Sequence, residues 1–155
     1  MAEQSGELKV VKAIIENTRG QVLFLCRALD EPWEPGQWEL PGGKLEPCEY
    51  GQECPAREIG EETGLVVSST REFARVKMPN ARPGYNPYKT IHFIFFECSL
   101  AVADDPIPRL SPEHSACAWL DPDTALRFFA THTSQASRIS LVALALYLCQ
   151  VSREP

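Results

Sequence analysis

Residues 43–65 read GKLEPCEYGQECPAREIGEETGL and carry three glutamates at helical spacing. Glu58, Glu61 and Glu62 stand at positions i, i+3 and i+4, so a helix places them on one face, while Ile59 points toward a core. Three carboxylates on one face repel one another and destabilise a bare helix. A hard divalent cation relieves this repulsion, and an all-oxygen ligand set suits Mg²⁺ or Mn²⁺. The alternative is a solvated acidic face, because runs of charge usually lie at the surface.

The helix that carries these glutamates is expected from about Gly51 to Thr63, with Gly64 as its C-terminal stop. Pro55 and Gly60 fit this helix badly, because an interior proline costs about 3 kcal/mol and an interior glycine about 1 kcal/mol. A proline is tolerated in the first turn, where its missing N–H has no helical partner to lose. We therefore predict that the helix begins late or irregularly.

The rest of the chain mixes strands and helices without strict alternation. Apolar, β-branched and aromatic runs predict strands at residues 10–15, 21–26, 38–40, 65–77, 90–100 and 116–120. A turn at 18–20 predicts that the first two strands form a hairpin, and the run at 90–100 predicts a central strand. Segments rich in proline, glycine and polar residues predict loops at 30–36, 79–88 and 103–114.

Two further helices are expected after the last strand. Asp121 can cap a helix that starts with Pro122 and runs to about Phe129. The helix expected from about Ser137 to Gln150 is apolar on most sides, so it belongs either to the core or to a subunit contact. The core position is favoured, and a homodimer stays open. These elements predict an α/β fold with a mixed sheet and helices packed on both faces.

Size, charge and cysteine usage limit the class of protein. The 155 residues fit one domain, 1–155, and a net charge of −6 repels a nucleic-acid backbone, so we expect no binding to polymeric DNA or RNA. No apolar run is long enough to span a membrane. The polar N-terminus predicts no secretory signal, and therefore a cytoplasmic protein with reduced thiols.

The six cysteines form no C-x-x-C pair and the three histidines are scattered, which argues against a zinc site. Cys26 and Cys98 lie in apolar runs and are expected in the core.

The spacing within residues 43–65 resembles the Nudix box at each of its defining positions. Those positions are Gly43, Glu49, Arg57, Glu58, Ile59, Glu61, Glu62, Gly64 and Leu65. The preceding WELPGG at 38–43 looks like the strand and turn that lead into this box, and Glu113 looks like the loop carboxylate of MutT-type pyrophosphohydrolases. A pattern of this length is far more specific than a short motif. The resemblance implies the family's α/β/α sandwich and hydrolysis of a pyrophosphate bond in a nucleotide derivative.

The resemblance also implies a role for each carboxylate. Glu58 and Glu62 would be direct metal ligands, and Glu61 would be a ligand or the general base. Glu113 is the leading candidate for the general base, with Glu61 close behind. The metal, Mg²⁺ or Mn²⁺, would neutralise phosphate charge and lower the pKa of the attacking water, whose proton a glutamate would remove.

Other residues of the box would support these ligands. Arg57 would orient Glu49 or Glu58 through its planar guanidinium. Gly42 and Gly43 would let the backbone approach metal or phosphate closely, and the Gly43 carbonyl could itself be a ligand. Gly64 would have the structural task of ending the helix.

Substrate contacts are expected from a loop and from a strand end. Loop residues Arg82, Tyr85 and Tyr88 could grip a phosphate and stack on a base. Arg27 could meet phosphate, and Trp33 could stack on a base or close its loop over the core. An ordinary packing or surface position is the alternative for each of these residues.

Several substrate classes are compatible with the box. A nucleoside triphosphate, unmodified or oxidised, is favoured because of the placement of Glu113 and the compact length of the chain. ADP-ribose or another nucleotide sugar is the second candidate. A non-catalytic nucleotide-binding sensor is disfavoured because every box glutamate is present, and an RNA-end processor is disfavoured by the acidic balance.

Overall fold

Two β-sheets form the centre of the fold, which a computed structural model describes for residues 7–80, 88–102 and 105–153. The larger sheet has the strand order β4 (Gly42–Lys44), β1 (Leu8–Ile15), β6 (Thr90–Leu100) and β5 (Val67–Pro79). The smaller sheet has the order β3 (Trp38–Glu39), β2 (Val22–Arg27) and β7 (His114–Leu120). β1 and β6 run parallel, and the other pairs run antiparallel, so the larger sheet is mixed.

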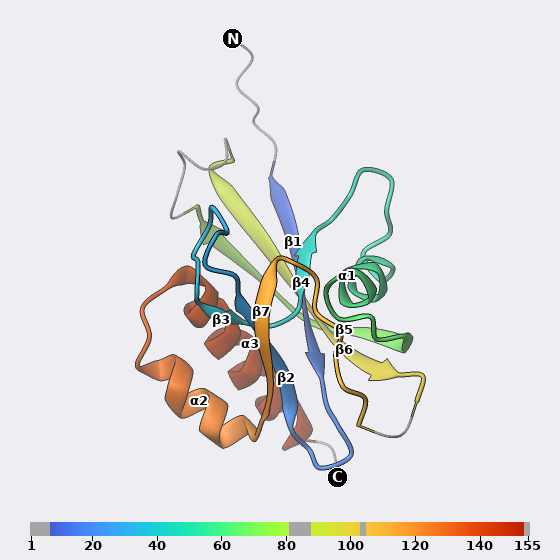
Figure 1. The fold of residues 1–155 in the computed structure, drawn as a ribbon. Coiled ribbons are helices and arrows are strands. Elements are labelled where there is room, and N and C mark those ends of the chain that lie inside the picture. The colour runs from blue at the N-terminus through green and yellow to red at the C-terminus, as the bar shows by residue number, and fades with distance from the viewer. Residues whose placement is uncertain (1–6, 81–87, 103–104, 154–155) are drawn as a thin grey trace.

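Helices cover both sides of these sheets, as Figure 1 shows. α1 (Cys54–Thr63) lies on one side, and α2 (Pro122–Ala130) and α3 (Gln135–Val151) lie on the other. The predicted α/β/α sandwich is confirmed. Among the described residues, no helix has the length and apolar character needed to cross a bilayer.

Alternation along the inner strands divides the core into two halves. Phe93 and Phe95 of β6 cluster with buried residues of α2 and α3, whereas Ile94 and Phe96 cluster with Ile59 of α1. Successive side chains of a strand point to opposite faces, so β6 supplies both halves of the core. Full burial of each such side chain contributes roughly 1.5–3 kcal/mol, which fixes α1 firmly against the larger sheet.

The predicted hairpin between the first two strands is reduced to a tight turn with one antiparallel bridge. β1 pairs with β4 and β6 in the larger sheet, whereas β2 pairs with β3 and β7 in the smaller sheet. The turn at 18–20 leads from one sheet to the other. It is closed by the Asn17 N–H, which donates to the Gln21 carbonyl at 2.9 Å, and by the bridge between Glu16 and Val22. Both edges of β1 are already taken by distant strands, which local turn chemistry does not reveal.

The boundaries of α1 agree with the expected irregular start. The helix begins at Cys54, and Pro55 occupies its first turn, where a missing N–H does no harm. Gly64 ends it with a φ of 69°, in the left-handed region that glycine adopts freely. The late start predicted from Pro55 is therefore confirmed.

The two later helices differ from expectation in their details. α3 begins at Gln135 rather than near Ser137, because the Ser134 side chain caps the helix by accepting the Ser137 N–H. The Asp121 side chain makes no capping hydrogen bond, and its carbonyl accepts the Ala125 N–H at 2.9 Å. Buried side chains of α3 belong to the main core cluster, as the favoured core position requires.

Two of the predicted loops overlap the ends of neighbouring strands. Most of the loop at 79–88 lies outside the described residues, and Pro79 itself ends β5. In the loop at 103–114, residues 103–104 lie outside the described residues, and His114 already belongs to β7. All six cysteines are free thiols, with Cys98 buried and Cys26 half-buried.

Candidate active site

The box glutamates approach the tight backbone of β4 from the side of α1. Glu62 is buried, and its Oε2 accepts a hydrogen bond from the Gly42 N–H at 3.0 Å. Gly42 has a φ of 142°, and a Cβ there would lie 2.0 Å from the Val11 carbonyl oxygen. A Cβ on Gly43 would lie 2.5 Å from the Glu58 carboxylate. Glycine at both positions therefore lets the helix carboxylates come close to the β4 backbone.

Arg57 binds three of the box carboxylates at once. Its Nε and Nη2 donate to the two Glu49 oxygens at 2.8 and 3.0 Å. Its Nη1 donates to Glu58 at 2.8 Å and to Glu61 at 3.3 Å. The hydrogen bonds from Arg57 are the main reason why the pKa of Glu49 is lowered to about 2. Both contacts expected of Arg57, with Glu49 and with Glu58, are present.

Burial makes the ionised form of two box glutamates unfavourable. The pKa of Glu62 is raised well above its usual value by burial and by the negative charges of Glu39 and Glu58. The pKa of Glu58 is raised by burial and by the charge of Glu61, despite the nearby guanidinium. A neighbouring cation reverses such shifts because it favours the charged form of a carboxylate.

The donor atoms of this site fit a hard divalent cation. Glu58 and Glu62 offer carboxylate oxygens beside the Gly43 backbone, and oxygen is the ligand that such cations prefer. Within the described ranges, no three His, Cys, Asp or Glu side chains are already arranged around one metal position. Glu58 and Glu61 instead bind Arg57, so a cation competes with Arg57 for their oxygens.

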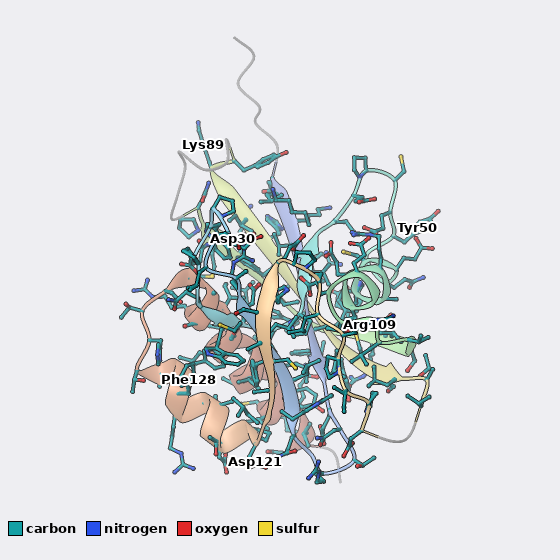
Figure 2. All side chains as sticks on the ribbon, viewed as in Figure 1. Asp30, Tyr50, Lys89, Arg109, Asp121 and Phe128 are labelled. Carbon is teal, nitrogen blue, oxygen red and sulfur yellow. The ribbon has the colours of Figure 1, made fainter. Side chains whose placement is uncertain are left out.

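The loop that carries Glu113 runs along the C-terminal end of α1. The Arg109 N–H donates to the Thr63 carbonyl at 2.8 Å, and the Ser111 N–H donates to the Glu62 carbonyl at 3.0 Å. Figure 2 shows Arg109 beside α1. The side chain of Glu113 is exposed to solvent. The structure thus brings this loop to the box glutamates, and the role of Glu113 stays a prediction.

A pocket of about 160 Å³ adjoins the same glycines. Ile91 and Phe93 of β6 contribute to its apolar wall, and Trp33 contributes from the loop that follows β2. Gly42 and Gly43 belong to the lining as well. The pocket and the box glutamates therefore share one boundary, the backbone of β4.

Two of the predicted substrate contacts, Arg27 and Trp33, line this pocket. The Arg27 guanidinium carbon lies 5.0 Å from the Trp33 ring centroid, and its Nε donates to the Trp33 carbonyl at 2.7 Å. Arg27 also forms ion pairs with Glu31 and Glu39, each at 3.0 Å. Arg27 thus holds Trp33 in the pocket wall, and the contact of Arg27 with phosphate stays a prediction.

The remaining substrate predictions concern the loop after β5. Tyr88 is half-buried and packs against the core cluster that includes residues of α2 and α3. Arg82 and Tyr85 lie outside the described residues. Base stacking by Tyr88 therefore stays a prediction beside an observed packing role.

Sequence reasoning misses a buried charge network next to the pocket. The Glu39 carboxylate accepts Lys12 Nζ at 2.9 Å and Arg27 Nη1 at 3.0 Å, and it lies 3.1 Å from His114 Nε2. The available signal is a charged residue inside an otherwise apolar strand, as Lys12 is in VVKAII. Because His114 directly follows Glu113, this network anchors the end of the Glu113 loop.

Comparison with known proteins identifies the family. The sequence matches the NUDIX domain over residues 7–140. The chain belongs to the Nudix family. It is 32% identical over 114 residues to a MutT-like protein of Streptomyces ambofaciens, an alignment that covers 73% of this chain and 63% of that protein. It is also 32% identical over 142 residues to nucleoside triphosphatase NudI of Klebsiella pneumoniae (strain 342), covering 85% of this chain and 92% of that protein.

Solved Nudix structures share the fold. The crystal structure of MutT protein from Methanosarcina mazei Go1 matches with a TM-score of 0.71 and 26% identity, covering 99% of this chain and 100% of that one. As a Nudix protein, the chain is a hydrolase that acts on phosphoanhydride bonds. Nudix hydrolases act on small-molecule nucleotides and generally use divalent metals.

Proposed function

We propose that this Nudix protein uses Mg²⁺ or Mn²⁺ to hydrolyse a pyrophosphate bond of a nucleoside triphosphate, unmodified or oxidised. The observation that carries the proposal is that Gly42 and Gly43 contact the α1 carboxylates and also line the pocket. Phosphates held at the glutamates therefore lie next to an apolar pocket with a few polar groups, the usual character of a small-molecule site. The protein acts as one domain, residues 1–155, in the cytoplasm.

The box glutamates hold the phosphates through the cation in this proposal. Glu58, Glu62 and the Gly43 carbonyl would hold the cation, which would neutralise phosphate charge and lower the pKa of the attacking water. Glu113 removes the proton from that water, with Glu61 as the second candidate, in a step worth about 10²–10⁴-fold. The exposed position of Glu113 leaves it free to swing toward the phosphates.

The other groups fix the geometry of the site. Arg57 holds Glu49 and Glu58 through its planar fork, which prevents the carboxylates from turning away from the phosphates. Trp33 offers an aromatic face for a base at the pocket wall. Arg27 keeps this ring in place through its hydrogen bond to the Trp33 carbonyl and its contact with the ring itself.

The similarity to NudI, which is named a nucleoside triphosphatase, supports a triphosphate substrate. ADP-ribose or another nucleotide sugar is the second candidate, because its diphosphate also fits beside the glutamates. A sensor without activity is the third, and the retained Glu58, Glu61 and Glu62 speak against it.

A substrate screen tests the proposal directly. The protein is incubated with ATP, CTP, GTP, UTP, an oxidised dGTP and ADP-ribose, each with and without Mg²⁺, and the products are separated by chromatography. We expect metal-dependent release of a nucleoside monophosphate and pyrophosphate from a triphosphate, and none from the Glu62→Gln variant. Turnover of ADP-ribose alone would favour the second candidate. If none of the compounds is hydrolysed in a metal-dependent reaction, the proposed enzymatic activity is refuted.

A further inference from the structure

Glu34 combines a strained backbone with deep burial. Its φ is 43°, in the left-handed region that residues other than glycine rarely adopt, and only 7% of its surface is exposed. Such a conformation persists only where the surrounding contacts hold it in place. An acidic side chain is also seldom buried unless its charge has partners.

The partners of Glu34 are at the N-terminus of α3. Its Oε1 accepts the Gln135 N–H at 2.8 Å, and its Oε2 accepts the Ala136 N–H at 2.7 Å. N–H groups in the first turn have no acceptor within their own helix, and the helix dipole favours a negative charge there. Hydrogen bonds to an ionised acceptor are stronger than neutral ones. Glu34 therefore ties its loop to a helix that lies 101 residues further along the chain.

Both segments that Glu34 joins form part of the pocket wall. Trp33 is its chain neighbour, Gln135 carries one of its two donors, and both residues line the pocket. On the other side, the loop is tied to β2, because Arg27 Nε donates to the Trp33 carbonyl at 2.7 Å and the Gly36 N–H donates to the Arg27 carbonyl at 3.0 Å. Asp30 marks this loop in Figure 2. Loss of the Glu34 carboxylate keeps the contacts to Arg27 and removes these two to α3.

We propose that Glu34 is a positioning residue that holds Trp33 and Gln135 in the arrangement that receives the nucleotide part of the substrate. The inference rests on the proposed function, because it requires the pocket to take the substrate. A wall that is ordered before binding spares the complex the entropy of ordering it. Glu34 acts on this wall and not on the α1 carboxylates, so it sets KM and leaves kcat nearly unchanged.

The test compares three variants with the wild-type enzyme. Glu34→Gln keeps the shape of the side chain but replaces one acceptor oxygen with an amide that cannot accept an N–H. Glu34→Asp keeps the charge on a shorter side chain. Asp123→Asn is the matched control, because Asp123 is an acidic residue in the first turn of α2. For each protein, kcat and KM are measured with whichever of ATP, CTP, GTP and UTP the wild type hydrolyses fastest, and hydrogen exchange is measured without ligand.

We expect Glu34→Gln to raise KM about tenfold, with kcat within about twofold of the wild type. Glu34→Asp restores part of the affinity, and Asp123→Asn changes neither constant. Without ligand, Glu34→Gln exchanges amide hydrogens faster in residues 28–37 and in the first turn of α3. An unchanged KM in Glu34→Gln, or an equal loss of kcat, overturns the role of Glu34. A wild-type protein that hydrolyses no nucleotide overturns the proposed function instead, and normal exchange in Glu34→Gln then separately refutes the tie to α3.

Discussion

The Lys12 ammonium donates a hydrogen bond to the Glu39 carboxylate at 2.9 Å, in the interior beside the pocket that Trp33 lines. Only 2% of the surface of Glu39 and 7% of that of Lys12 is exposed, so water cannot replace either partner in the hydrogen bond. Burial alone would raise the pKa of Glu39, but the charge of Lys12, the hydrogen bond with His114 and the charge of Arg27 lower it to about 2. The carboxylate is therefore ionised at every pH at which the enzyme is expected to work.

Replacing Glu39 with Gln should destabilise the fold strongly. The variant leaves the buried Lys12 without its counter-charge and leaves Arg27 with Glu31 alone. Breaking a buried pair in this way costs about 3–5 kcal/mol. Urea unfolding followed by circular dichroism measures the change. Glu72→Gln is the control, because Glu72 pairs with Arg75 at the surface, where such pairs contribute about 0–1 kcal/mol. Equal stability of the two variants would contradict the role assigned to the network.

The lowered pKa of Glu39 makes the free energy of unfolding depend on pH. The pKa of Glu39 is lower in the folded protein than the usual 4.5, so its contribution to stability is complete above about pH 4.5 and is lost as the pH falls toward 2. The predicted loss is of the order of 3 kcal/mol. The charge of Glu39 also raises the pKa of Glu62, so the comparison is made in the Glu62→Gln background, where that titration is absent. Thermal melts of Glu62→Gln and of the Glu62→Gln/Glu39→Gln double variant between pH 7 and pH 2.5 give the difference. A difference that stays constant over this range would show that Glu39 is not the titrating group.

Replacing Glu62 with Gln should separate catalysis from folding. The amide oxygen can still accept the Gly42 N–H. Burial raises the pKa of Glu62, so its ionised form destabilises the fold at pH 7, and the variant removes that form. The melting temperature of the variant without metal should therefore equal or exceed that of the wild type at pH 7. Turnover is lost, and so is the rise in melting temperature that Mg²⁺ gives the wild type. Calorimetric melts with and without Mg²⁺ measure the melting temperatures, and the assay of the substrate screen measures turnover. Full activity in this variant would refute the ligand assignment.

A methyl group on Gly43 should push Glu58 out of position. The new Cβ would lie 2.5 Å from the Glu58 carboxylate, and a displacement of about 1 Å in a catalytic site can cost 10²-fold in rate. We expect kcat of Gly43→Ala to fall about a hundredfold while the protein remains folded. Gly60→Ala is the control within α1, since its Cβ meets only the Leu65 carbonyl oxygen at 3.9 Å. That variant keeps its activity and gains up to about 1 kcal/mol of stability.

Replacing Arg57 with Lys should weaken the enzyme without unfolding it. Lysine keeps the charge but cannot hold the two Glu49 oxygens with a planar fork. Loss of such an orienting contact typically reduces activity about 10–100-fold. Glu49→Gln should have a similar effect, and the double variant should be little worse than either single one, because both remove the same interaction. Strictly additive losses in kcat would show that the two residues act independently.

The parts of the site that could be predicted are local in sequence. Glu58 and Glu62 share one helix face by spacing alone, and the φ of 69° at Gly64 follows from the glycine itself. The late start of α1 follows from Pro55, whose ring is tolerated only at a helix N-terminus. Each of these features depends on residues within a few positions of one another.

The parts that could not be predicted depend on register between distant strands. Lys12 and Glu39 are 27 residues apart, and they meet because Lys12 stands opposite Gly42 in the pairing of β1 with β4. His114 joins them from β7, which lies in the same sheet as Glu39 but is 75 residues further along the chain. Glu34 is a similar case, since neither its positive φ nor its contact with α3 leaves a periodic signal in the sequence.

The central pairing of β1 with β6 has a consequence for biosynthesis. Residues 8–15 find their parallel partner only at residues 91–98, and contacts of such long range slow folding because a large loop must close first. During translation, α1 leaves the ribosome well before β6, the inner strand whose Ile94 and Phe96 share a core cluster with Ile59 of α1. A nascent chain that already displays every residue from 43 to 65 therefore still has no catalytic centre, and hydrolytic capacity arrives only with the second half of the polypeptide.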